Sequence, residues 1–388
     1  MKIFYYLPSL YTSGGLERII MLKANYFADH LGHDITILTS EQKGRLPYYK
    51  LSGKVKLIDL GIVIDTRYKR FSFRKLTSYP FKYYRFKKRF SAVLYQYRPD
   101  IVISTLRREL NFICSVGDGS IKIGEFHVTR YAYHAGSVHE NNYLLKVIKK
   151  YWGNHFVAKL KKLARLVLLT EEEVLNWPEL SNTVVIPNPL SLFPEKVSAC
   201  ENKQVIAVGR HSYQKGFDLL ADAWTIVHDR HPDWLLKIYG EGEKAPLLRQ
   251  IKDNKLEGSC ILENPVKNID DKYTESSIFV LSSRFEGFGM VIAEAMACGV
   301  PPVSFACPCG PKDIIKDGTD GLLVRPGDIP GLADKICFLI ENREIRKEMG
   351  KNARKNIERL KFENVAQRWE RLFNELKKNR IVVPEPEK

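Results

Sequence analysis

Two glutamates eight positions apart, Glu286 and Glu294, form the clearest chemical pattern in this sequence. They lie in the segment 282–301, SSRFEGFGMVIAEAMACGVP, which follows the apolar run IFVLS. A strand, a glycine-rich turn and a helix in this order aim backbone N–H groups at an anion. Each carboxylate accepts two hydroxyl hydrogen bonds, which suits the vicinal diol of a sugar or ribose. Two glutamates at arbitrary spacing are usually surface residues, but the glycine turn and the EAMACGVP run favour a binding site.

A second constellation, VGRHSYQKGFD, supplies two cations just after another apolar run, QVIAV. Arg210 and Lys215 would lie at the end of a strand, next to Gly209 and Gly216. Cations at this position can neutralise an anion such as a diphosphate, including one that gains charge as a leaving group. Taken alone, one arginine and one lysine in a loop are more often solvated. The preceding strand and the flanking glycines are what favour a binding role for these two residues.

The N-terminal half offers two weaker candidates. Gly15 lies in SGGLE, at the first strand-to-helix turn, where backbone approaches a phosphate closely. His127 ends the strand pattern IKIGEFH, although a lone histidine is more often structural. We leave Glu125 out of the expected site, because side chains alternate between the two faces of a strand.

The elements that would position these residues alternate between short apolar runs and helical patterns, which indicates parallel sheets covered on both faces. The alternation breaks at the proline-rich segment 182–204 and then restarts. We therefore expect an α/β protein with two Rossmann-like domains whose parallel sheets face a central cleft. The expected ranges are residues 1–190 for the first domain and 191–365 for the second. Residues 366–388 are expected to form a helix that crosses back to the first domain, followed by a frayed tail.

The charge is uneven along the chain. The net charge is +16, and residues 1–190 hold 30 Lys and Arg against 15 Asp and Glu. Residues 67–98 hold eleven basic residues and no acid, mixed with many rings, and residues 146–165 form a second basic stretch with helical spacing. Basic and aromatic residues together suit an anionic membrane surface. Nucleic acid is the competing partner, and a solvated basic face is the plain alternative.

The rest of the sequence disfavours a membrane-spanning protein, a secreted protein and a metal-binding protein. No apolar run reaches the roughly 18 residues of a membrane span, and the N-terminus lacks a signal-peptide pattern. The seven cysteines are scattered without a CxxC pair, so we expect free thiols in a cytoplasmic protein and no zinc site. The chain contains no D-x-D motif of the kind that holds a metal on a diphosphate.

The E-x7-E spacing, the EGFG turn and the EAMACG-x-P run together resemble the signature of the retaining glycosyltransferases of family four, which have the GT-B fold. The resemblance extends along nearly the whole chain and is strongest over residues 203–330. It implies that Glu286 contacts the donor sugar, that Glu294 holds the ribose, and that His127 lies near the transferred sugar. The residues expected at the catalytic centre are His127, Arg210, Lys215 and Glu286. The residues expected to contact the donor are Gly15, Arg210, Lys215, Glu286, Phe288, Gly289, Met290, Val291 and Glu294. The segment CGPKDII at 309–315 receives no catalytic role.

The resemblance implies sugar transfer with retention, without a metal and without a cofactor, since the nucleotide-sugar is a substrate. A UDP-hexose or UDP-N-acetylhexosamine is the preferred donor, with GDP-mannose as the alternative. The acceptor would be a glycan or a lipid-linked glycan of bacterial surface polysaccharide or lipopolysaccharide. This predicts a cytoplasmic enzyme that is peripheral on the inner face of the plasma membrane and does not bind nucleic acid. The alternatives are a nucleotide-sugar epimerase of the same architecture and a basic nucleic-acid-binding protein.

Overall fold

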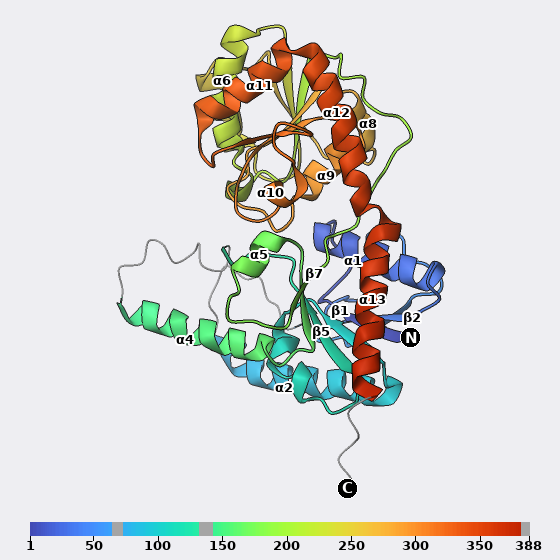
Figure 1. Ribbon diagram of the computed structural model, residues 1–388. Helices are drawn as coiled ribbons and strands as arrows, with labels where there is room; N and C mark the ends of the chain where they lie inside the picture. Colours follow the sequence, from blue (N-terminus) through green and yellow to red (C-terminus); the bar gives the residue numbers. More distant parts are fainter. Residues whose placement is uncertain (64–72, 132–142, 382–388) are drawn as a thin grey trace.

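The computed structural model describes residues 1–63, 73–131 and 143–381 of the chain, which form two α/β units stacked one above the other (Figure 1). The expected tail at 382–388 and the basic residues at 67–72 lie outside the described ranges. Each unit contains one parallel sheet with helices on its faces, and the two sheets have seven and six strands. The chain therefore folds as two Rossmann-like domains with parallel sheets.

The first sheet has the strand order β3-β2-β1-β4-β5-β6-β7. Its strands are β1 (Lys2–Tyr6), β2 (Asp34–Thr39), β3 (Lys56–Asp59), β4 (Ile101–Ser104), β5 (Ile121–Glu125), β6 (Arg165–Leu168) and β7 (Thr183–Val185). Its helical segments are α1 (Gly15–Asp29), α2 (Phe73–Tyr97), η1 (Arg108–Asn111), η2 (Ile113–Ser115), α4 (Tyr143–Leu160) and α5 (Glu171–Leu175). The second basic stretch, expected as one helical pattern over 146–165, therefore includes all but the first turn of α4, the residues 161–164 that follow it, and the first residue of β6.

Burial on both faces explains the continuous apolar runs of these strands. In β1, Ile3 and Tyr5 pack into a core with α1, while Phe4 and Tyr6 pack on the opposite face with α2. A parallel strand covered by helices on both sides needs apolar side chains at successive positions instead of an alternating pattern. The run KIFYYL meets this requirement, and β4 is buried along its whole length.

The second sheet has the strand order β10-β9-β8-β11-β12-β13. Its strands are β8 (Gln204–Val208), β9 (Leu235–Tyr239), β10 (Cys260–Glu263), β11 (Ile278–Leu281), β12 (Pro302–Phe305) and β13 (Leu322–Val324). Its helical segments are η3 (Tyr213–Lys215), α6 (Phe217–Arg230), α7 (Ala245–Asp253), α8 (Ile269–Thr274), α9 (Met290–Ala297), α10 (Pro311–Ile314), α11 (Ile329–Glu341), α12 (Arg343–Ile357) and η4 (Glu358–Leu360). The expected boundary at residue 190 falls between β7 and β8.

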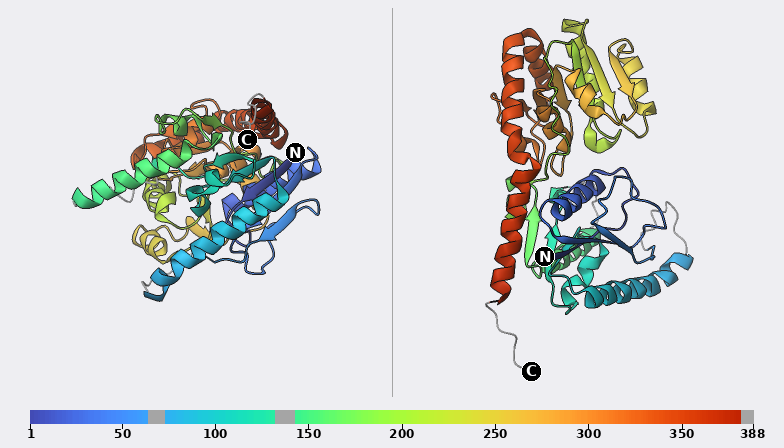
Figure 2. Two further views of the ribbon diagram at one scale, coloured as in Figure 1. Left: turned by 90° about the horizontal axis from the view of Figure 1, so that it is seen from below. Right: turned by 90° about the vertical axis from the view of Figure 1, so that its right-hand side faces the viewer.

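The last helix, α13 (Phe362–Ile381), belongs spatially to the first sheet. It continues the direction of α12 after the short turn η4, and the two helices run along both units (Figures 1 and 2). Val365, Trp369 and Phe373 recur every four residues and are buried in the same core as β1 and α1. This spacing places them on one face of the helix, so α13 completes the covering of the first sheet.

Candidate functional site

The expected donor segment forms a strand, a tight turn and a helix in the second sheet. Strand β11 ends at Leu281, and α9 begins at Met290 directly after Gly289, whose φ of 91° favours glycine. Glu286 lies in the turn and is buried, and its Oε1 accepts hydrogen bonds from Lys215 Nζ at 2.7 Å and from Ser283 Oγ at 2.6 Å. The carboxylate is therefore held in a fixed position at the mouth of α9.

The neighbouring strand β8 brings Lys215 to this carboxylate. The loop after β8 passes through η3 and reaches Gly216, which has a φ of 60°. A Cβ atom at Gly216 would lie 2.2 Å from the carbonyl oxygen of Ser282, so glycine allows this loop to pack on the turn. Arg210 lies on the same loop with an exposed side chain, and its guanidinium contacts neither glutamate of the pair in the described structure. The structure thus joins Lys215 to Glu286 and leaves Arg210 at the edge of the site.

The second glutamate of the pair, Glu294, lies in α9 and contacts the first domain. Its Oε1 accepts hydrogen bonds from Ser191 Oγ at 2.5 Å and from Arg18 Nη1 at 3.0 Å. Arg18 belongs to α1, so this ion pair joins the two domains. The phenol of Tyr273 lies 3.5 Å from Glu294 Oε2, and its pKa is raised well above the usual value by burial and by the Glu294 charge.

Sequence reasoning missed Arg18, although it lies three residues after Gly15. Arg18 and Glu294 are 276 positions apart in the sequence, and no local sequence pattern indicates a contact over such a separation. Gly15 is exposed at the first position of α1, and a Cβ atom there would meet nothing within 4 Å. The N-terminal end of α1 is therefore open on the side of the domain that faces Glu294.

His127 lies two residues after β5, and its backbone packs against the donor turn. A Cβ atom at Gly287 would lie 2.5 Å from the carbonyl oxygen of His127. Only a residue without a side chain allows these two backbones to approach so closely. The His127 side chain is 11% exposed, and its Nε2 lies 3.1 Å from Glu125 Oε1. The structure therefore brings His127 and the Glu286–Gly289 turn together, and it adds the glutamate that the sequence analysis left out.

The remaining donor candidates lie in the turn and at the start of α9. Phe288 and Gly289 are buried, and Met290 and Val291 are half-buried at the first two positions of the helix. A Cβ atom at Gly310 would lie 2.0 Å from the carbonyl oxygen of Phe288, so the loop after β12 supports the turn from behind. The backbone amides of this turn are therefore fixed by packing on both sides.

The same loop also contacts the first domain through Cys309. The Cys309 thiol donates to Glu173 Oε2 at 2.8 Å, and its backbone N–H donates to Glu172 Oε2 at 2.9 Å. Thr129 Oγ1 lies 3.2 Å from the same sulfur. Burial raises the pKa of the Cys309 thiol, which keeps it protonated as a donor. The segment CGPKDII therefore holds the domains together at the rim of the site.

Metal-binding side chains are not gathered here. Over residues 1–63, 73–131 and 143–381, no group of three or more His, Cys, Asp or Glu side chains is arranged to hold a metal ion. The positive groups near the turn include Lys215 and the backbone N–H groups at the start of α9, while Arg284 of the turn segment is paired with Asp218. The arrangement can hold an anion between a cation and a helix N-terminus.

The family of glycosyl transferases group 1 matches residues 192–356, which include the Glu286–Glu294 pair, Arg210 and Lys215. Two relatives extend over the whole chain. An uncharacterised glycosyltransferase of Haemophilus influenzae is 26% identical over 373 residues, which is 95% of this chain and 98% of the relative. An α-1,4-N-acetyl-D-galactosaminyltransferase of Campylobacter jejuni, named for a GalNAc-containing diphosphate-undecaprenol substrate, is 26% identical over 393 residues, which is 97% of this chain and 99% of the relative.

The fold also matches solved glycosyltransferase structures. A variant of Staphylococcus aureus TarM, solved with fondaparinux, α-GlcNAc-glycerol and UDP, has a TM-score of 0.75 and 19% identity. The match covers 96% of this chain and 99% of that chain. Residues 192–356 are therefore those of a group 1 glycosyltransferase, the retaining family with the GT-B fold, and the whole chain has that fold. It is therefore a glycosyltransferase that uses a nucleotide-sugar donor.

The approach of Gly287 to His127 generates a first prediction. Replacing Gly287 by Ala places a methyl group 2.5 Å from a carbonyl oxygen of the other domain, so the two backbones must separate. A displacement of about 1 Å costs up to roughly 10²-fold in rate, so we expect kcat to fall by about that factor. Steady-state kinetics measures this change. Gly258→Ala is the control, because Gly258 is exposed and its added Cβ would meet nothing within 4 Å. Equal kcat values for the two variants would contradict the prediction.

Proposed function

We propose that this protein transfers a hexose or N-acetylhexosamine from a UDP donor, with retention of configuration, to a glycan or lipid-linked acceptor in surface polysaccharide or lipopolysaccharide biosynthesis. GDP-mannose is the alternative donor. The observation that carries the proposal is the 2.7 Å contact of Lys215 with Glu286 at the mouth of α9. Glu286 lies in the turn that packs against the backbone of His127, and Lys215 reaches it from the loop after β8, so a cation and a carboxylate of one domain meet the His127 segment of the other.

The donor would lie along α9. Glu294 accepts the ribose hydroxyls, since among the described residues its Oε2 makes only the long contact with Tyr273. Glu286 accepts a hydroxyl of the transferred sugar, and the amides of Phe288, Gly289, Met290 and Val291 contact the sugar and the diphosphate. Gly15 faces the diphosphate from the first domain, because the open N-terminal end of α1 lies one turn before Arg18.

The chain's own groups would stabilise the departing diphosphate. Lys215 and Arg210 supply positive charge, and the start of α9 supplies N–H donors, so the reaction proceeds without a metal ion. The acceptor hydroxyl attacks on the face that the diphosphate leaves, and the diphosphate accepts the acceptor proton. His127 lies near the transferred sugar. The protein thus acts mainly by positioning groups and by stabilising charge.

The choice of nucleotide and acceptor is supported by similar proteins. The TarM structure contains UDP, which favours a UDP donor for this chain. The Campylobacter relative acts, by its name, on a diphosphate-undecaprenol substrate, which favours a lipid-linked acceptor. Neither relative fixes the sugar, because hydroxyl stereochemistry is recognised by few contacts.

A basic and aromatic surface of the first domain supports docking on an anionic membrane. Within the described residues, no helix is long and apolar enough to span a bilayer. Helix α2 buries Phe86 and Phe90 in the core and exposes Phe81 and Tyr84, each 62% exposed, on another face. Arg85 lies over the Phe81 ring at 5.6 Å, so cations and rings share this face. We name the exposed faces of α2 and α4 the α2–α4 surface.

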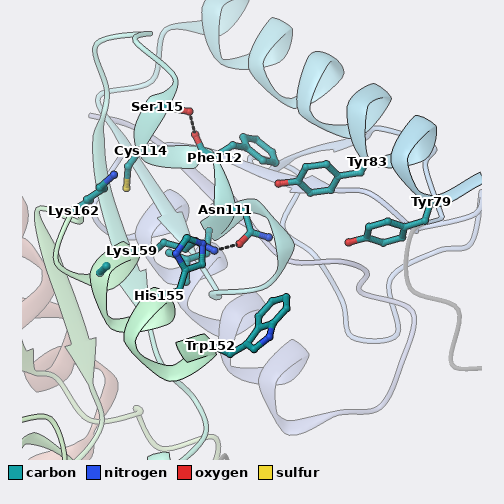
Figure 3. A pocket seen from close by; sticks show the side chains of 12 residues that line it. Tyr79, Tyr83, Asn111, Phe112, Cys114, Ser115, Trp152, His155, Lys159 and Lys162 are labelled. Atoms are coloured by element: carbon teal, nitrogen blue, oxygen red, sulfur yellow. Dashed lines mark hydrogen bonds between the residues drawn. The ribbon is translucent and has the colours of Figure 1, made fainter. Parts of the chain in front are cut away.

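A pocket of about 610 Å³ lies between these two helices (Figure 3). Its described lining includes the rings of Tyr79, Tyr83 and Trp152 and the amino groups of Lys159 and Lys162, and it includes no carboxylate. Burial lowers the pKa of Lys159, whose Nζ donates to Asn111 Oδ1. The cations and rings that line this pocket suit an anionic headgroup. The side chains of 143–151, which include Lys146, lie outside the described residues.

The role of Glu294 leads to a test by nucleotide binding. Replacing Glu294 by Ala leaves the ribose hydroxyls unpaired, so affinity for UDP should fall by about 1–3 kcal/mol. Isothermal titration calorimetry with UDP alone measures this loss, and thermal melting of the free variant reports whether it is folded. Unchanged affinity in a folded variant would remove Glu294 from the donor site.

The charge of the leaving group leads to a kinetic test. Alanine at Arg210 or Lys215 should lower kcat as well as donor affinity, by roughly 10²-fold or more, because their charge matters most as the diphosphate departs. EDTA should leave wild-type activity intact. A change in KM alone would assign the two cations to uniform binding, and restoration of an EDTA-treated enzyme by Mg²⁺ would contradict the metal-free mechanism.

The α2–α4 surface leads to a test by vesicle co-sedimentation. The basic residues of α2 in the expected membrane face are Lys82, Arg85, Lys87, Lys88 and Arg89. Arg89 donates to the carbonyl oxygen of Leu60 at 2.6 Å and is left intact for folding. Neutralising the other four should weaken attachment to anionic vesicles by about 1 kcal/mol per charge.

Added salt should weaken wild-type attachment in the same assay. The matched control neutralises four exposed cations of the second domain, Arg249, Lys252, Lys255 and Lys267, which should leave attachment unchanged. Equal sedimentation with neutral and anionic vesicles, or none with either, would remove the membrane role of this surface.

A further inference from the structure

A buried ion pair lies directly behind His127. The side chains of Lys23 in α1 and Glu125 at the end of β5 are each 1% exposed, and Lys23 Nζ donates to Glu125 Oε1. Lys23 also lies 4.8 Å from the centre of the Trp369 ring of α13. A buried pair of charges rarely stabilises a fold more than apolar side chains of the same size, because both ions lose their water. Stability alone therefore does not explain this pair, which suggests a functional role.

Glu125 and His127 are two residues apart along an extended segment, so their side chains lie on the same side. Glu125 Oε1 lies 3.1 Å from His127 Nε2, which is within ion-pair distance although the two groups are not aligned as a hydrogen bond. This nitrogen is inaccessible to solvent and has no hydrogen-bond partner among the described groups. The carboxylate thus faces the inner nitrogen of the imidazole. The opposite nitrogen, Nδ1, is the one left for a ligand.

The charge on Glu125 follows from its surroundings. Burial opposes ionisation, but Lys23 and His127 outweigh it and hold the pKa of Glu125 at about 2. Glu125 is therefore a carboxylate at neutral pH, and a carboxylate only accepts hydrogen bonds. The ring nitrogen that faces it carries the proton, which selects one tautomer of His127.

We propose that Glu125 is a positioning residue for His127, and that Lys23 keeps Glu125 ionised for this task. The carboxylate orients the ring and fixes the proton on Nε2, so that Nδ1 accepts a hydroxyl hydrogen bond from the transferred sugar. The backbone of His127 packs on Gly287, so the ring is anchored at both of its ends next to the donor turn. This inference rests on the proposed role of His127 in the donor site.

The test removes both buried charges together. Glu125→Gln alone leaves Lys23 buried without a negative partner and is expected to destabilise the fold. The double variant Lys23→Met/Glu125→Gln has no buried charge at this position, so its thermal stability should return to near the wild-type value. Its kcat should nevertheless fall by roughly 10–100-fold, the range typical when a carboxylate that orients a metal-bound histidine is removed. UDP affinity, measured by calorimetry, should stay within about twofold, because the proposed ribose contacts lie in the other domain.

A matched control removes a similar pair from the opposite end of the same strand. Lys122 donates to Asp118, and these side chains are 8% and 0% exposed. Lys122→Met/Asp118→Asn should leave kcat unchanged. Wild-type kcat in a folded Lys23→Met/Glu125→Gln variant, or an equal loss in the control, would overturn the proposal. His127→Ala separates the two hypotheses: wild-type kcat in that variant would remove His127 itself from the mechanism, whereas a loss there with none in the double variant would remove only Glu125.

Discussion

The contact between Gly287 and the carbonyl oxygen of His127 is the constraint on which the candidate site depends. The turn that carries Glu286 belongs to one sheet and the histidine to the other, and the missing Cβ lets their backbones meet. The ion pair of Arg18 with Glu294 and the contacts of Cys309 with Glu173 hold the domains together at two further points. Each of these contacts joins residues that are distant in sequence, so the geometry of the site is a property of the closed pair of domains.

The part of the site that lies within one segment was predictable from the sequence. Strand β11, the glycine turn and α9 follow one another directly, and the apolar run, the turn residues and the helix ending each leave a local signal. Lys215 was predictable for a related reason. It follows β8, which pairs with β11 in parallel, so the loops after both strands emerge at the same edge. The two-domain parallel fold followed from the same repeated rhythm of strands and helices.

Contacts between distant segments were not predictable in the same way. In the sequence, Arg18 cannot be distinguished from any other cation of an amphipathic helix. Only the structure shows that α1 lies opposite α9 and that Arg18 contacts Glu294. Glu125 was set aside because neighbours in a strand alternate, yet it is two residues from His127, and a period of two returns to the same face. That signal was present in the sequence. The pairing with Lys23 was not, because a buried lysine in α1 has no local pattern that separates it from an exposed one.

The position of α13 has a consequence for the order in which the two domains form during synthesis. Strands β1 to β7 leave the ribosome first, yet Trp369 and Phe373 of their core are made last. The second sheet, with α6 to α12, is complete as soon as residue 357 has emerged. Domains usually fold in the order in which they are made. Here all the elements of the second domain are synthesised before those of the first domain are complete. Part of the apolar surface of the first domain therefore stays exposed until α13 has been synthesised and packs on it.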